Sequence, residues 1–130
     1  DSFMHLHLGF KTEGISEQTL ADLQCHYMYM NDWARGVGAE DNAVLMSIPS
    51  VADPSLAPDG YMVMHAYTPA TERYDRWEGL ERGTEEYEAL KEERSQFLWR
   101  AIERVIPDIR ERAVVQRVGT PLTHKRFLNV

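Results

Sequence analysis

Four of the five histidines fall in segments whose pattern predicts strands: His5, His7, His26 and His65. His5 and His7 are two residues apart, so both side chains point to the same side of an extended chain. Neutral imidazole is a common ligand of zinc and other transition metals, and a His-x-His pair presents two such ligands together. No aspartate or glutamate lies within the strands to complete a typical site. The pattern therefore favours hydrogen bonding on a half-polar sheet face over metal coordination, with a histidine-rich metal site as the alternative.

Two other patterns could indicate nucleophilic catalysis or nucleotide binding, but the residues support neither strongly. Cys25 and His26 are adjacent, so on a strand they point to opposite faces and cannot form a nucleophile–base pair. In "RGVGAEDN" (35–42) the third glycine of a dinucleotide-binding fingerprint is replaced by Asp41. The segment also lacks the strand-to-helix crossover that such a fingerprint needs, so it predicts a loop. The single cysteine cannot form an internal disulfide, which favours a reducing compartment.

Methionine and tyrosine give the predicted strands a soft, apolar character. Such side chains adapt to irregular shapes and can line a cavity for a long hydrophobic ligand. Packing in the core beneath a helix is the alternative, and composition alone favours it. The cavity candidates are Tyr27, Tyr29, Met62 and Met64.

The elements that must position these residues change type along the chain. Alternation or apolar runs predict strands at 3–10, 24–32, 43–49, 61–69 and 113–119, and a loop at 50–60. A short helix is expected at 15–23, with Ser16 as its N-cap. A helix of about six turns is expected from Thr84, its N-cap, to Pro107, and another begins at Thr120 and Pro121. The order indicates an α+β fold, a mostly antiparallel sheet covered by a long helix.

Length and charge narrow the class of protein. The 130 residues correspond to one domain or a piece of a larger one, and the composition is that of a globular chain. A net charge of −7 argues against binding to nucleic acid, which needs clustered lysine and arginine. The sequence contains no apolar run near the ~20 residues that span a membrane, and no signal-peptide pattern. Both ends look cut, so we expect a piece of a longer protein.

Four long stretches together resemble the carotenoid isomerase branch of the phytoene desaturase-like FAD-dependent oxidoreductases. The similarity extends over nearly the whole chain and does not depend on one short motif. The stretches are "SFMHLHLGF", "NDWARGVGAEDNAVLMSIPSVADPSLAPDGYMVMHAYTP", "YDRWEGLERGTEEYEALKEERSQFLWRAIERVIPDIRERA" and "VGTPLTHKRFLN".

The resemblance implies that residues 1–130 are a single, partial substrate-binding domain, like that of flavin amine-oxidase-like enzymes, without the FAD-binding segments. It implies cis-to-trans isomerisation of a poly-cis carotene such as prolycopene, with reduced FAD as the reactive group. The partners implied are a long apolar carotene and the remainder of the flavoprotein chain, in a plastid or cyanobacterial cell, with peripheral membrane association. FAD is not expected to be held by this piece alone. The alternatives are a related polyene desaturase or saturase and, from another class, a non-catalytic binding domain.

The resemblance assigns no catalytic side chain within these residues. The positions expected near flavin or polyene are Thr120, Pro121, Thr123 and His124, because a helix N-terminus favours anionic or polar groups. A simple helix cap is the alternative for them. The resemblance also strengthens the interpretation of the Tyr27, Tyr29, Met62 and Met64 set as part of a substrate tunnel.

Overall fold

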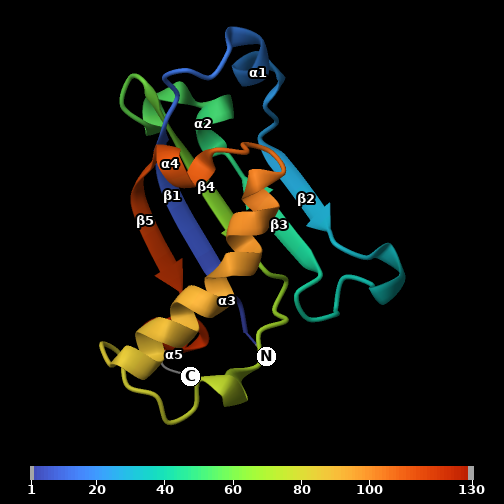
Figure 1. The fold of residues 1–130 in the computed structure, drawn as a ribbon, viewed down its shortest axis with the longest axis vertical. Helices are drawn as coiled ribbons and strands as arrows, with labels where there is room; N and C mark the ends of the chain where they lie inside the picture. The colour runs from blue at the N-terminus through green and yellow to red at the C-terminus, as the bar shows by residue number, and fades with distance from the viewer. Residues whose placement is uncertain (1, 129–130) are drawn as a thin grey trace.

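A computed structural model describes residues 2–128 and shows a twisted antiparallel sheet with a long helix packed across one face (Figure 1). The strand order is β2-β3-β4-β1-β5, so the first strand of the chain lies inside the sheet. The expected α+β class with an antiparallel sheet is confirmed. The strands are β1 (His5–Lys11), β2 (His26–Met30), β3 (Ala43–Ser47), β4 (Tyr61–Tyr67) and β5 (Ala113–Gly119).

The alternation read from residues 3–10 is confirmed in β1. Leu6, Leu8 and Phe10 are buried, whereas His5 is half-buried and His7 is exposed. The strand begins two residues later than predicted. Because successive side chains of a strand point to opposite faces, one face of the sheet is apolar and buried and the other carries the histidines.

The helix that covers the buried face is α3 (Glu85–Glu103). Its N-cap is Thr84, as predicted, and the side chain of Thr84 accepts a hydrogen bond from the backbone N–H of Tyr87 at 3.3 Å. The helix has 19 residues, or just over five turns, and Arg104 is its C-cap. It is therefore shorter than the run of about six turns predicted to extend to Pro107. A further turn, α4 (Ile109–Arg112), was not predicted.

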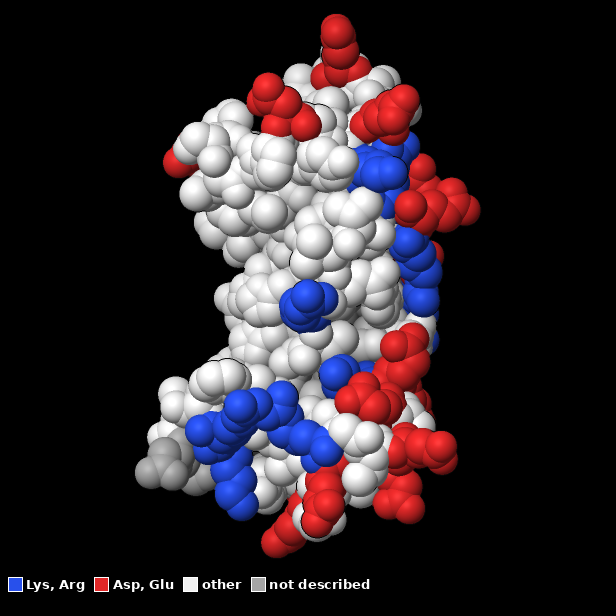
Figure 2. Space-filling model, turned by 90° about the vertical axis from the view of Figure 1, so that its left-hand side faces the viewer, with Lys and Arg blue, Asp and Glu red and all other residues white. Residues whose placement is uncertain are grey.

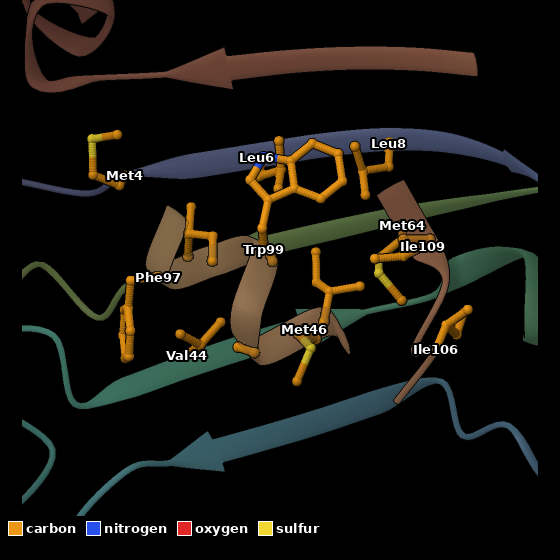
Figure 3. Close-up of a cluster of buried hydrophobic side chains, with 14 of the residues drawn as sticks. Met4, Leu6, Leu8, Val44, Met46, Met64, Phe97, Trp99, Ile106 and Ile109 are labelled. Atoms are coloured by element: carbon orange, nitrogen blue, oxygen red, sulfur yellow. The ribbon is translucent and has the colours of Figure 1, made fainter. Parts of the chain in front are cut away.

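The core lies between α3 and the sheet (Figure 3). Phe97 and Trp99 of α3, with Ile109 of α4, pack with Leu6 of β1 and Met46 of β3. Burying one such side chain contributes about 1.5–3 kcal/mol. This layer therefore holds the sheet and the helix together as one unit.

The connections hold more helix than predicted. Residues 50–60, expected as a loop, include most of helix α2 (Pro49–Ala52) and the whole 3-10 turn η2 (Pro54–Leu56). Both elements have proline in their first turn. α1 (Glu17–Asp22) is capped by Ser16 as predicted. The remaining elements are the 3-10 turns η1 (Trp33–Arg35) and η3 (Tyr74–Arg76), and α5 (Pro121–Leu128). None of the described helices is long and apolar enough to cross a membrane.

A buried ion network ties α3 to two loops. Arg94 donates to both carboxylate oxygens of Glu72, from Nε at 3.0 Å and from Nη2 at 2.9 Å. It also donates to both oxygens of Asp41, at 3.0 and 2.7 Å. Glu72 is only 2% exposed and accepts a third hydrogen bond, from the indole N–H of Trp77 at 3.2 Å. Arg94 therefore fixes the middle of α3 against the loops that follow β2 and β4.

Candidate functional site

The sheet face opposite α3 has no helix packed along its length (Figure 1). In the view of Figure 2, the margin away from α3 is indented and mostly uncharged, whereas charged side chains gather on the α3 side and at the two ends. We call this surface the open face. It carries the odd-numbered side chains of β1 and those that pair with them in the antiparallel register.

Three histidines meet on the open face. His7 of β1 pairs directly with His65 of β4, and His5 lies two residues away on the same side of β1. The rings of His7 and His65 stack with centroids 4.1 Å apart. His5 Nδ1 lies 2.7 Å from His65 Nε2, a hydrogen-bonding distance. One ring nitrogen from each residue lies within 4.8 Å of the others. We call these three residues the histidine cluster.

A fourth imidazole and two further aromatic rings border the cluster. His124 comes from α5, and its ring centroid lies 4.7 Å from that of His5. Phe3 contacts the rings of both His5 and His124, and Tyr67 stacks on His65 at 5.0 Å. The cluster and α5 enclose an open cavity of about 310 Å³, lined by His5, His7, His65, Gly119, Thr123, His124, Phe127 and Leu128.

The cluster is held in its neutral form. Burial, together with repulsion from His65, His124 and His7, lowers the pKa of His5 to about 4. Burial and repulsion from His7 lower the pKa of His65 to about 4. Burial also lowers the pKa of His7. Near neutral pH the three imidazoles of the cluster are therefore uncharged, and their nitrogens are available as hydrogen-bond partners or metal ligands.

The four residues predicted near the start of α5 divide into two pairs. Thr123 and His124 line the cavity. Thr120 and Pro121 are buried, and the Thr120 hydroxyl is 2.9 Å from the hydroxyl of Tyr87. Thr120 also accepts a hydrogen bond from the backbone N–H of Thr123 at 3.4 Å, as an N-cap does. The structure thus gives Thr120 a helix-capping contact, and proximity of these residues to flavin or polyene stays a prediction.

The four tunnel candidates lie on the other side of the sheet, facing α3. Met64 is 2% exposed and belongs to the core (Figure 3). Met62 packs against that core, and Tyr29 stands 6.3 Å from the ring of Phe97. Tyr27 and Tyr29 also border a groove of about 450 Å³ beside α1 and α3. A tunnel role for these residues stays a prediction, whereas the open face offers a second apolar surface.

Two aromatic members of the site were not among the predicted residues. Phe3 and Tyr67 occupy the same alternating positions as the histidines, so the period-2 pattern could have found them. His26 also lies on the open face but stands apart from the cluster, where it contacts Ser47 Oγ at 3.2 Å. Cys25 is a free thiol.

Comparison with known proteins identifies carotenoid isomerases as relatives of this chain. They are prolycopene isomerases, as the resemblance predicted. The chain is 36% identical over 129 residues to Prolycopene isomerase 1, chloroplastic, of an Oncidium hybrid cultivar. It is 34% identical over 128 residues to Prolycopene isomerase, chloroplastic, of Arabidopsis thaliana. A third, from Daucus carota, is 31% identical. Each match covers 98% of this chain but only 20% of the relative. The chain therefore spans about a fifth of the length of the proteins it matches. No family model matches it.

Proposed function

We propose that this chain is part of a carotenoid cis–trans isomerase that acts on a poly-cis carotene and resides in a plastid or a cyanobacterial cell. The observation that carries the proposal is the similarity to prolycopene isomerases over 98% of the chain. Residues 1–130 then form part of a substrate domain, and the rest of the longer protein is its first partner. Peripheral association with a membrane, where such a substrate dissolves, belongs to the same proposal.

The open face supports a role next to an apolar substrate. Leu45, Val63 and Tyr67 lie on it, together with the half-exposed Met28. Contact with a polyene removes such side chains from water, at a gain of about 25 cal/mol per Å² of apolar area. The neutral histidines add polar groups without adding charge. We infer that the face is one wall of the substrate site.

Reduced FAD is the reactive group that the relationship implies, and in such enzymes the cofactor carries the chemistry. The described residues do not provide a cradle for it. Gly36 and Gly38 lie in the loop between β2 and β3, without the strand-to-helix turn that holds a pyrophosphate. The Thr120 hydroxyl at the start of α5 already contacts Tyr87 and Thr123. We therefore propose that other segments of the protein hold FAD.

The test uses the full-length protein with its reduced flavin. A poly-cis carotene is supplied, and the products are separated by chromatography and identified by mass and absorption spectrum. Conversion to a trans isomer of unchanged mass is expected. A product that has gained two hydrogens would instead identify a saturase, and a product that has lost two hydrogens in a parallel reaction with oxidised flavin would identify a desaturase. Unchanged carotene that co-purifies with the protein would identify a binding domain.

A matched pair of variants tests the assignment of the open face. Leu45→Lys places an ammonium group on that face, and desolvating it against a polyene costs several kcal/mol. We expect kcat/KM to fall at least about tenfold, which corresponds to 1.4 kcal/mol. Gln116→Lys adds the same ammonium group at an exposed position of edge strand β5 that pairs with Leu8 and therefore faces the other side of the sheet. This control should keep its activity, and equal losses in both variants would contradict the assignment.

A further inference from the structure

We propose that the histidine cluster binds a divalent transition-metal ion of the zinc class, with His5, His7 and His65 as its three protein ligands. The inference goes beyond the isomerase function and does not rest on it. It also differs from the sequence-based expectation, which favoured hydrogen bonding because no carboxylate lies on the strands.

The backbone places the three ligands together. His7 and His65 are direct register partners, and side chains so placed have Cβ atoms about 4.5–5.5 Å apart. His5 follows on the same face of β1, where side chains two residues apart are neighbours. Three imidazoles on two paired strands form a rigid donor set, because hydrogen bonds to both neighbouring strands hold β1.

The distances suit coordination. Zinc binds imidazole nitrogen at 2.0–2.1 Å, so nitrogens in a tetrahedral site lie about 3.3 Å apart. In the cluster one ring nitrogen of each histidine lies within 4.8 Å of the others. Rotations of the rings about their side-chain bonds can close these separations to the tetrahedral value and bring the nitrogens onto one ion.

The chemistry of the donors agrees with their geometry. Metal binding needs neutral imidazole, the form that histidine mostly takes near neutral pH. In addition, His5 Nε2 is buried and has no hydrogen-bond partner among the described residues. A buried nitrogen of this kind is normally paired. An ion bound through His5 Nε2 would supply that partner, and the contact of His5 Nδ1 with His65 would then orient the ring.

Three protein ligands leave one tetrahedral position for an exchangeable group. In this fold that position can open toward the cavity of about 310 Å³ that the cluster lines together with α5. Three-histidine sites that keep an open position bind water or another small ligand there. His124 borders the cavity but stands outside the group of ligand atoms that lie within 4.8 Å, so we infer a site that does not require it.

The experiment titrates the full-length protein, freed of metal by a chelator and dialysis, with Zn²⁺ in a calorimeter. Co²⁺ serves as a spectroscopic probe, because its visible absorption reports a tetrahedral site. We expect each of the variants His5→Ala, His7→Ala and His65→Ala to bind one Zn²⁺ fewer per molecule than the unchanged protein. Loss of an outer-shell partner already weakens metal sites by about 10–100-fold, so loss of a ligand should weaken this one by at least about 100-fold.

His26→Ala is the matched control, because it removes a histidine from the same face, at a position that contacts Ser47 and not the cluster. His26→Ala and His124→Ala should both retain the site. His7 is exposed, so His7→Ala should fold, and circular dichroism of the metal-free variant checks this. Zn²⁺ affinity and stoichiometry that are unchanged in a folded His7→Ala or His65→Ala protein would overturn the proposal. Carotene isomerisation is not part of the readout, so failure here leaves the proposed function standing.

Discussion

Replacing Arg94 by methionine should strongly destabilise the fold. Arg94 is 14% exposed and Glu72 is 2% exposed, so the substitution leaves a buried carboxylate without its main counter-ion. Breaking a buried pair on one side costs about 3–5 kcal/mol. Arg76 remains 3.6 Å from Glu72, and Trp77 still donates to it, so we expect the lower end, about 3 kcal/mol. The accompanying loss of contact with Asp41, whose side chain is 42% exposed, adds little.

The measurement is urea unfolding of this chain, followed by tryptophan fluorescence, to which the buried Trp77 contributes. Arg73→Met is the matched control, because its partner Asp75 and Arg73 itself are both 57% exposed, and we expect a loss below about 1 kcal/mol. Adding Glu72→Gln to Arg94→Met removes the uncompensated charge and keeps an acceptor for Trp77. The double variant should therefore be more stable than Arg94→Met alone. Equal, small losses for Arg94→Met and Arg73→Met would refute the reasoning.

Three other predictions concern the core, the start of α5 and the histidines. Met64→Ala should lower the free energy of unfolding by about 2–5 kcal/mol in a urea titration, because it opens a cavity beneath α3. Tyr87→Phe removes the buried contact with Thr120 and should cost about 1 kcal/mol, read from the same titration. With metal chelated, stability should be greatest above pH 6.5 and decline toward pH 4, because His5 and His65 have lower pKa values in the folded state than in the unfolded chain, which therefore binds more protons in this range. Unfolding free energies measured across that range check this, and a flat profile would contradict it.

Local patterns were enough to predict much of the fold. The alternation of β1 and the Thr84 cap of α3 are consequences of nearest-neighbour chemistry, and both are confirmed. The helical turns at 49–56 were missed, although Pro49 and Pro54 are residues that favour a first turn. Proline is common both in loops and at the first position of a helix, so a proline-rich segment does not distinguish a loop from a helix start.

The candidate site was harder to predict, because it depends on register between strands far apart in sequence. The pairing of His7 with His65 depends on tertiary structure and cannot be read from the spacing of residues along the sequence. β4 also carries apolar residues on both sides, Met62 and Met64 on one and Val63 and Tyr67 on the other. Its pattern could group these residues by side but could not show which side α3 would cover.

The position of β1 between β4 and β5 has a consequence for how the chain folds. Residues 5–11 must pair with residues 61–67 and with residues 113–119, so β1 leaves the ribosome about a hundred residues before one of its two partners. Contacts between such distant segments slow folding, because the loops between them must close first. Until β5 has been synthesised, one edge of β1 lacks its partner strand, and unpaired edges of this kind make a nascent chain prone to aggregation.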